Sequence, residues 1–258
     1  DLVYIVAGNG NFLVYNSSSN SVINLSNTCI LAGCFGTKQI QRIESIGSEL
    51  LFIITATDNR LWIYNRTSNT TANYTPSSGF GGSYSAAYDP YNNIVYVSAT
   101  SGNYGYFNVS NNNFTVLSAT DPLNWISTNG IFSIVYYNES RLPILGISST
   151  GHKFGYYNIT SNITEDVGSW YNGQIPSTLS NSTYIKNFNT GDLFIYNTGS
   201  PGPKIIFLNM TSKKSINYDY ILGRYSGVTS GYDALEYIPA TNELFAGFGS
   251  GQLVKINL

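Results

Sequence analysis

The sequence Leu61-Trp62-Ile63-Tyr64-Asn65 indicates the architecture of this chain, because versions of it recur from one end to the other. Each version is a short apolar, aromatic-rich run that ends on asparagine. The other five are Phe12–Asn16, Tyr104–Asn108, Phe154–Asn158, Ile205–Asn209 and Leu253–Asn257. Successive asparagines are 43 to 51 residues apart. A near-constant period of this length is typical of repeat architectures, so the chain is predicted to contain six structural repeats.

Each repeat contains more strands than this one run. A second apolar run precedes it across a tight turn, as Leu50–Thr55 does across Asp58-Asn59. Such turn residues accept positive φ and indicate β-hairpins. Five repeats also have an earlier strand, such as Gln41–Ile46, and five have a later one, such as Thr71–Tyr74. The repeat is therefore predicted to be a four-stranded antiparallel meander, whose strands we label A to D in chain order.

Four-stranded units of this period predict an all-β fold, a six-bladed β-propeller of four-stranded antiparallel meanders. The whole chain, residues 1–258, is expected to form a single propeller domain. The predicted blades are 1–37, 38–82, 83–129, 130–181, 182–230 and 231–258. The first repeat lacks strand A and the last ends after strand C, so the sequence leaves the closure of the ring open.

The third repeat resembles a known family. Ser85–Val97 contains Tyr-Asp-Pro-Tyr-Asn-Asn followed by Val-Tyr-Val. It looks like the YVTN-type propeller repeat of archaeal and bacterial surface proteins, which places Tyr-Asp-Pro-X-Asn between strands A and B. Ile238–Phe245 is a weaker version of the same turn. The resemblance implies an extracellular propeller of the kind found in surface-layer or adhesion proteins, and it implies no catalytic residues.

The sequence carries twelve Asn-X-Ser/Thr sequons, which indicate a secreted or cell-surface N-glycoprotein. The expected glycosylation sites are Asn16, Asn24, Asn65, Asn69, Asn73, Asn108, Asn113, Asn138, Asn158, Asn162, Asn181 and Asn209. All except Asn181 map to strand D, to C–D turns or, for Asn138, to an A–B turn. Glycans there would prevent the outer edge strands of the sheets from pairing with other chains. The alternative is that asparagine and threonine suit these turns and that the sequons are a by-product.

The longer D–A connections lie at the opposite end of the predicted blades and form the expected partner surface, because loops on a rigid scaffold commonly carry function. Its aromatic residues are Phe80, Trp125, Trp170, Tyr171, Tyr220 and Tyr225. These side chains could instead cap the core between blades. Cys29 and Cys34 lie in the first connection and are predicted to form a disulfide, with a pair of buried free thiols as the alternative.

The composition excludes several classes of function. Charged residues make up 10% of the chain, and the 12 Lys and Arg are scattered singly, so no basic surface is expected for nucleic acid. No apolar stretch is long enough to insert into a membrane. No signal peptide is visible, so if the protein is exported, residue 1 is expected to be a processed or trimmed end. A surface that is mostly neutral and polar also suggests adaptation to an acidic exterior, because it changes little with pH.

The sequence offers little catalytic chemistry. His152, the only histidine, is expected in an exposed hairpin turn, Thr150–Lys153, and nucleophile-elbow, phosphate-loop and metalloprotease motifs are absent. Asp89 is interpreted as a turn-former before Pro90, which leaves Asp233 as the candidate for a site in the central channel. No cofactor or metal site is predicted, although a structural calcium held by turn carbonyls and Asp side chains stays open.

These observations favour a non-enzymatic, N-glycosylated, extracellular β-propeller. It would act as a recognition or decorating protein on a cell surface, a filament or a virion. Its expected partners are other surface, filament or capsid proteins, or glycans. Two alternatives stay open: a carbohydrate-binding, lectin-like propeller that uses the aromatic loops, and an enzyme of lactonase or glycosidase type that uses the central channel. The enzyme would need several charged groups that converge at the axis.

Overall fold

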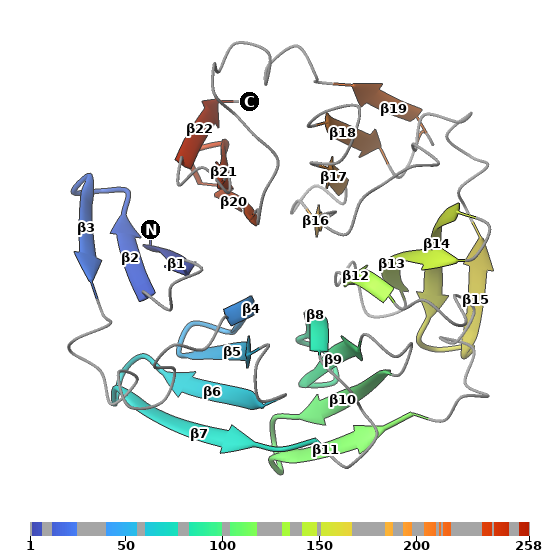
Figure 1. Cartoon of the computed structure of the whole chain (residues 1–258), viewed down its shortest axis with the longest axis horizontal. Helices are drawn as coiled ribbons and strands as arrows, with labels where there is room; N and C mark the ends of the chain where they lie inside the picture. Colours follow the sequence, from blue (N-terminus) through green and yellow to red (C-terminus); the bar gives the residue numbers. More distant parts are fainter. Residues whose placement is uncertain are drawn as a thin grey trace. The chain divides into compact units, whose positions relative to one another are not determined.

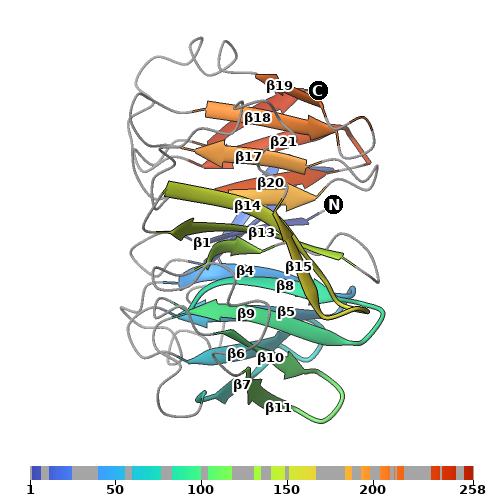
Figure 2. The same ribbon diagram turned by 90° about the vertical axis from the view of Figure 1, so that its right-hand side faces the viewer.

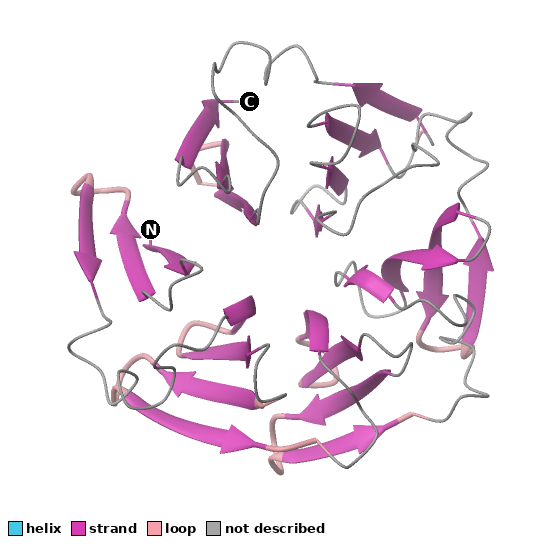
Figure 3. Ribbon diagram, in the orientation of Figure 1, coloured by secondary structure: helices cyan, strands magenta, loops and turns pink. Residues whose placement is uncertain are grey.

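The computed structural model describes all or part of every predicted repeat. The described residues are 2–6, 12–24, 40–55, 60–76, 83–99, 104–117, 131–134, 141–148, 151–166, 184–187, 193–197, 204–209, 212, 214–217, 234–238, 240–247 and 253–257. The regular elements among them are all β-strands (Figure 3). The chain divides into two compact units, Asp1–Asn124 and Trp125–Leu258.

The first unit contains three antiparallel sheets, in which neighbouring strands follow the order of the chain (Figure 1). The first sheet consists of β1 (Leu2–Val6), β2 (Phe12–Asn16) and β3 (Ser21–Asn24). The second consists of β4 (Ile40–Ile46), β5 (Leu50–Thr55), β6 (Leu61–Asn65) and β7 (Thr70–Tyr74). The third consists of β8 (Ser83–Asp89), β9 (Ile94–Ala99), β10 (Tyr104–Asn108) and β11 (Asn113–Val116). Figure 2 shows β8 to β11 in this order across the third sheet.

The second unit repeats the same design in three further antiparallel sheets. One sheet consists of β12 (Ile131–Ile134), β13 (Arg141–Ser148), β14 (Gly151–Asn158) and β15 (Ile163–Asp166). The next consists of β16 (Tyr184–Asn187), β17 (Leu193–Asn197), β18 (Lys204–Asn209) and β19 (Lys214–Asn217). The last consists of β20 (Ala234–Ile238), β21 (Glu243–Gly247) and β22 (Leu253–Asn257).

The predicted meander of strands A to D is confirmed in the described residues. Four sheets have all four strands, the first sheet starts at strand B, and the last has strands A to C. The D strands are β3, β7, β11, β15 and β19, and each lies at one edge of its sheet. At the other edge, the A strands β4 and β8 contact each other in the first unit, and β16 contacts both β12 and β20 in the second.

The structure corrects one predicted turn. His152 was expected in the hairpin turn Thr150–Lys153, but it is the second residue of β14 and pairs with Ile147. Ser148 pairs with Gly151, so only two residues connect β13 and β14. The sequence Thr-Gly-His-Lys is typical of a turn, but the register of the pairing extends the strand through it.

The sheets of the first unit stack because their central strands are apolar on both faces. Four consecutive residues of β5, Leu51 to Ile54, are fully buried. Since alternate side chains of a strand point to opposite faces, Leu51 and Ile53 pack with Phe12 of the first sheet. Phe52 and Ile54 pack instead with side chains of the third sheet. A continuous apolar run of this kind is typical of a strand covered on both sides.

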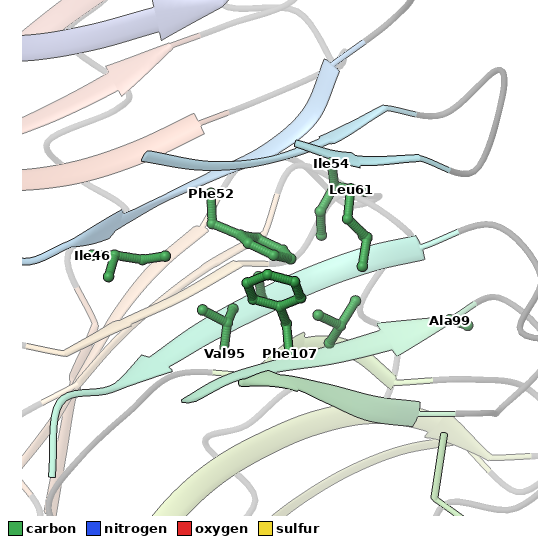
Figure 4. Packing of buried hydrophobic residues seen from close by; sticks show 9 residues of the cluster. Ile46, Phe52, Ile54, Leu61, Val95, Ala99 and Phe107 are labelled. Atoms are coloured by element: carbon green, nitrogen blue, oxygen red, sulfur yellow. The ribbon is translucent and has the colours of Figure 1, made fainter. Parts of the chain in front are cut away.

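The core between the second and third sheets is centred on two phenylalanines (Figure 4). The ring centroids of Phe52 and Phe107 are 5.7 Å apart, and Leu61 and Val95 belong to the same cluster. Tyr74 of strand D packs against Phe107 from the outer side, with ring centroids 4.9 Å apart. Burial of each such aromatic side chain stabilises the fold by about 2–3 kcal/mol, so the stacking of sheets is the main source of stability.

Candidate functional site

In the second and third sheets the A–B and C–D turns meet at one end, which we call the turn end. In the second sheet, the backbone N–H of Arg66 in the C–D turn donates to the carbonyl of Glu49 in the A–B turn at 2.8 Å. In the third sheet, Val109 donates to Asn93 in the same way at 3.1 Å. Arg66 also donates from Nη2 to the carbonyl of Gly47 at 2.9 Å. The two turns of a sheet therefore form one surface, as the sequence predicted.

The asparagine that ends strand C builds the C–D turn. The Oδ1 atom of Asn65 accepts hydrogen bonds from the backbone N–H groups of Thr67 and Ser68, each at 2.9 Å. Asn16 and Asn108 make the same pair of bonds in their turns. Asn158 and Asn209 bond to the N–H group three residues on. Backbone N–H groups in the turn have no partner on a neighbouring strand. Asparagine recurs at this position because its side-chain carbonyl accepts hydrogen bonds from these groups.

A second asparagine ends four of these turns, and its role was missed in reading the sequence: Asn20, Asn69, Asn112 and Asn162. Asn69 has a φ of 55°, in the left-handed region that asparagine tolerates better than most residues. The hydroxyl of Tyr64, the residue before Asn65, donates to Asn69 Oδ1 at 3.1 Å. The equivalent pairs in other C–D turns are Tyr15 with Asn20 at 2.9 Å and Tyr157 with Asn162 at 2.7 Å. In the third sheet the same bond joins Tyr88 to Asn93 at 3.0 Å, but in the A–B turn. The spacing Tyr-Asx-X-X-X-Asn in the sequence is the signal that could have predicted these tyrosine-to-asparagine hydrogen bonds.

Asp89 serves the A–B turn of the third sheet as asparagine serves the C–D turns. Its Oδ1 accepts the backbone N–H groups of Tyr91 at 2.9 Å and Asn92 at 3.2 Å, and its Oδ2 accepts Asn92 Nδ2 at 2.7 Å. The side chain is fully buried. Burial and the neighbouring Asp89 charge raise the pKa of Tyr88 above its usual value. The interpretation of Asp89 as a turn-former is confirmed, since both carboxylate oxygens are engaged in the turn.

The described sequons occupy three kinds of position. Those that end strand C are half-buried: Asn16, Asn65, Asn108, Asn158 and Asn209. Those at the left-handed turn position are exposed: Asn69 and Asn162. Those on strand D are also exposed: Asn24, Asn73 and Asn113. The first two kinds have a role in the turn itself, whereas the strand-D asparagines lie in extended backbone, where asparagine is disfavoured.

The turn role of an asparagine is compatible with carrying a sugar. An N-glycan is attached to the side-chain nitrogen of asparagine. The turn bonds of Asn65 use Oδ1 alone. The attachment atom, Nδ2, is therefore not needed to hold the turn, and the same holds for the turn bonds of Asn16 and Asn108.

Several predicted residues lie outside the described part of the chain. They are Asn138, Asn181, Cys29, Cys34, Asp233, Phe80, Trp125, Trp170, Tyr171, Tyr220 and Tyr225. The disulfide and the aromatic partner surface therefore stay predictions. Within the described residues, no group of three or more His, Cys, Asp and Glu side chains is placed to hold a metal ion. That part of the chain also has no helix long and apolar enough to cross a membrane.

Comparison by sequence identifies no relative of this chain: no protein-family model matches it, and no curated protein matches it significantly. Comparison of structures finds solved chains with a similar fold. A chain of the nidogen/laminin complex matches with a TM-score of 0.65 at 10% identity, covering 100% of this chain and 93% of that chain. An auxiliary nutrient binding protein from Bacteroides thetaiotaomicron matches with a TM-score of 0.65 at 12% identity, covering 98% of this chain and 65% of that chain.

A third solved structure is an extracellular domain described as part of a one-component system from the same bacterium. It matches with a TM-score of 0.55 at 12% identity, and the match covers 98% of this chain and 31% of that chain. Likenesses at such low identity show the fold alone. The matching chain of the nidogen/laminin complex is a β-propeller. The fold of this chain is therefore of the β-propeller kind, built from antiparallel four-stranded sheets.

Proposed function

We propose that this chain is a non-enzymatic, N-glycosylated, extracellular β-propeller that binds other surface molecules. The similar structures support this proposal, because they belong to a nidogen/laminin complex, a nutrient binding protein and an extracellular domain. The partners in this proposal are proteins or glycans of a cell surface, a filament or a virion. The resemblance of Ser85–Val97 to the YVTN-type repeat supports an archaeal or bacterial surface as its location.

The proposal includes a closed ring in which the whole chain forms six blades. The observation that supports it is the regular meander. A tyrosine-to-asparagine bond recurs with it, in the C–D turns of the first, second and fourth sheets and in the A–B turn of the third. A scaffold of this kind separates two ends of the molecule: one made of A–B and C–D turns, and one made of B–C and D–A connections. No cofactor is part of the proposal.

In this proposal, glycans cover the turn end and the D strands, and partners bind at the opposite end. Ten of the twelve sequons lie on strand C, on strand D or in a C–D turn of the described residues. Intact-mass measurement of the native protein before and after enzymatic deglycosylation tests the first half. The proposal predicts a mass well above 28.3 kDa that falls on treatment. A native mass equal to that of the bare polypeptide would refute glycosylation.

The proposal that partners bind at the end opposite the turn end is tested by substituting aromatic residues of the D–A connections. Trp125→Ala and Trp170→Ala should each weaken retention of the co-purifying surface partner by about tenfold or more, because buried aromatic anchors dominate many interfaces. Tyr91→Ala is the matched control, since Tyr91 is an aromatic residue with 74% exposure at the turn end. Loss of partner binding in the Tyr91 variant alone would place the partner at the wrong end. Specific binding on a glycan array would favour the lectin-like alternative.

A further inference from the structure

The D strands are the exposed edges of the sheets, and an unprotected edge is a template for pairing with another chain. The exposed edge residues include apolar side chains on three D strands, among them Val116 of β11, which is 37% exposed. Val22 and Ile23 of β3 are 59% and 51% exposed, and Ile163 of β15 is 60% exposed. Val22 and Ile23 are consecutive, so β3 exposes apolar side chains on both of its faces. Natural proteins commonly protect such edges with charged side chains.

Charge is present on only some of the described D strands. The strand β15 contains Glu165 and Asp166, and β19 contains Lys214. The side chains of Glu165 and Lys214 are exposed. Neither strand contains a sequon asparagine. These two edges therefore carry the usual protection by charge.

The other three D strands show the opposite combination. The strands β3, β7 and β11 contain no charged residue. Each contains one sequon asparagine, at Asn24, Asn73 and Asn113 respectively. All three asparagine side chains are exposed. Each of the five described D strands therefore contains either charged residues or a sequon asparagine, and none contains both.

We propose that glycans on Asn24, Asn73 and Asn113 protect the three uncharged edges against strand pairing between copies of this chain. A glycan is bulky and hydrated, so on a D strand it prevents a second strand from approaching the unpaired backbone groups. The asparagines that end strand C lie within the turns and do not have this role. The inference rests on the proposed glycosylation and adds which sugars keep the protein monomeric.

The test compares three variants of the full chain, each produced in a host that glycosylates the parent protein. The edge variant carries Asn24→Gln, Asn73→Gln and Asn113→Gln. The turn variant carries Ser18→Ala, Thr67→Ala and Thr160→Ala, which removes the same number of sequons and keeps Asn16, Asn65 and Asn158 in their turns. The charge variant carries Asn24→Lys, Asn73→Lys and Asn113→Lys, which imitates Lys214 of β19.

Light scattering across a range of concentrations gives the weight-average mass of each variant. The edge variant should self-associate, reaching at least about twice its monomer mass, whereas the turn and charge variants should stay monomeric. The charge variant also shows that these positions tolerate the loss of asparagine. An edge variant that stays monomeric at every concentration, or a turn variant that associates equally, would overturn the inference.

Site-resolved mass spectrometry of glycopeptides separates this inference from the proposed function. Carbohydrate at the turn sequons but not at Asn24, Asn73 and Asn113 would overturn the inference alone. Absence of carbohydrate from the whole chain would overturn the proposed glycosylation as well. Occupancy at all three strand-D asparagines is the expected result.

Discussion

Asn65 and its equivalents show how one residue type serves both folding and the proposed surface chemistry. The side-chain carbonyl of Asn65 accepts hydrogen bonds from two backbone N–H groups of the turn, while its nitrogen would carry the proposed glycan. A sequon at this position therefore has a structural explanation that does not require a sugar. Replacing the asparagine removes the turn bonds and the sequon together. A second variant that removes only the sequon and keeps the asparagine is therefore needed to separate the two effects.

Asn65→Ala should lower the free energy of unfolding by about 1–2 kcal/mol, because two turn donors lose their acceptor. Asn65→Asp should lower it by less than about 0.5 kcal/mol, because Asp89 makes the same bonds in its own turn. Chemical denaturation of protein made without glycosylation measures both. Equal losses for alanine and aspartate would show that the side-chain acceptor does not stabilise the turn.

The hydrogen bond from the tyrosine hydroxyl to the left-handed asparagine can be tested by removing it in one turn and by adding it in another. Tyr64→Phe removes the hydroxyl that donates to Asn69 and should lower the free energy of unfolding by about 1 kcal/mol. Phe107 occupies the equivalent position before Asn108, and Asn112 has the same left-handed φ of 55°. Phe107→Tyr would supply the missing hydroxyl and should leave stability unchanged or slightly higher. A loss for Phe107→Tyr as large as that for Tyr64→Phe would contradict a stabilising role of this hydrogen bond.

At the scale of the elements, stacking of sheets through two-faced strands dominates stability. Phe52 is fully buried between the second and third sheets. Phe52→Ala should cost about 3–5 kcal/mol, the usual range for truncating a core aromatic residue. Tyr91→Ala, on an exposed turn, should change stability by less than about 0.5 kcal/mol. Thermal and denaturant unfolding measure the difference, and a small effect of Phe52→Ala would mean that the two sheets do not depend on each other.

Much of the arrangement of strands could be predicted from the sequence. The repeat ending on asparagine fixed strand C of every sheet, and the predicted partner strands agree with the structure to within a few residues. For example, Leu50–Thr55 was predicted and observed without change. The strand predictions were accurate because the apolar runs and the turn residues indicate the same hairpins.

The predictions that failed depend on contacts that composition does not reveal. The bond from Tyr64 to Asn69 joins residues five apart across a turn, so neither residue alone indicates it. His152 was wrongly placed in a turn because its neighbours are turn-forming residues, although pairing with Ile147 extends β14 past them. The sequons could be located from the sequence, but only the strand assignment divides them into turn-forming asparagines and asparagines at the edges.

For the whole molecule, scarcity of charge predicts a stability that changes little with pH. Hydrogen bonds from Lys255 and Thr241, with the Lys255 charge, lower the pKa of Glu243. Its contribution is therefore present above the unfolded pKa and is lost only as the pH falls through the lower folded value. Burial and Asp89 raise the pKa of Tyr88. Its contribution is present below the unfolded pKa of 10.0 and is lost as the pH rises through the higher folded value.

Thermal unfolding from about pH 2 to pH 11 should therefore show a Tm that is nearly constant between these two limits. Glu243→Gln should reduce the small decline on the acid side, and Tyr88→Phe should reduce the decline on the alkaline side. A steep loss of Tm below about pH 4 would contradict the proposed adaptation to an acidic exterior.

A cryo-EM map of the protein isolated from its native source, at a resolution that reveals attached sugars, would show both the ring and the position of the sugars. We expect six sheets arranged around one axis, with carbohydrate on the D strands and at the turn end and with a partner at the opposite end. Two stacked sheets in place of a ring, or sugars distributed equally over both ends, would contradict this expectation.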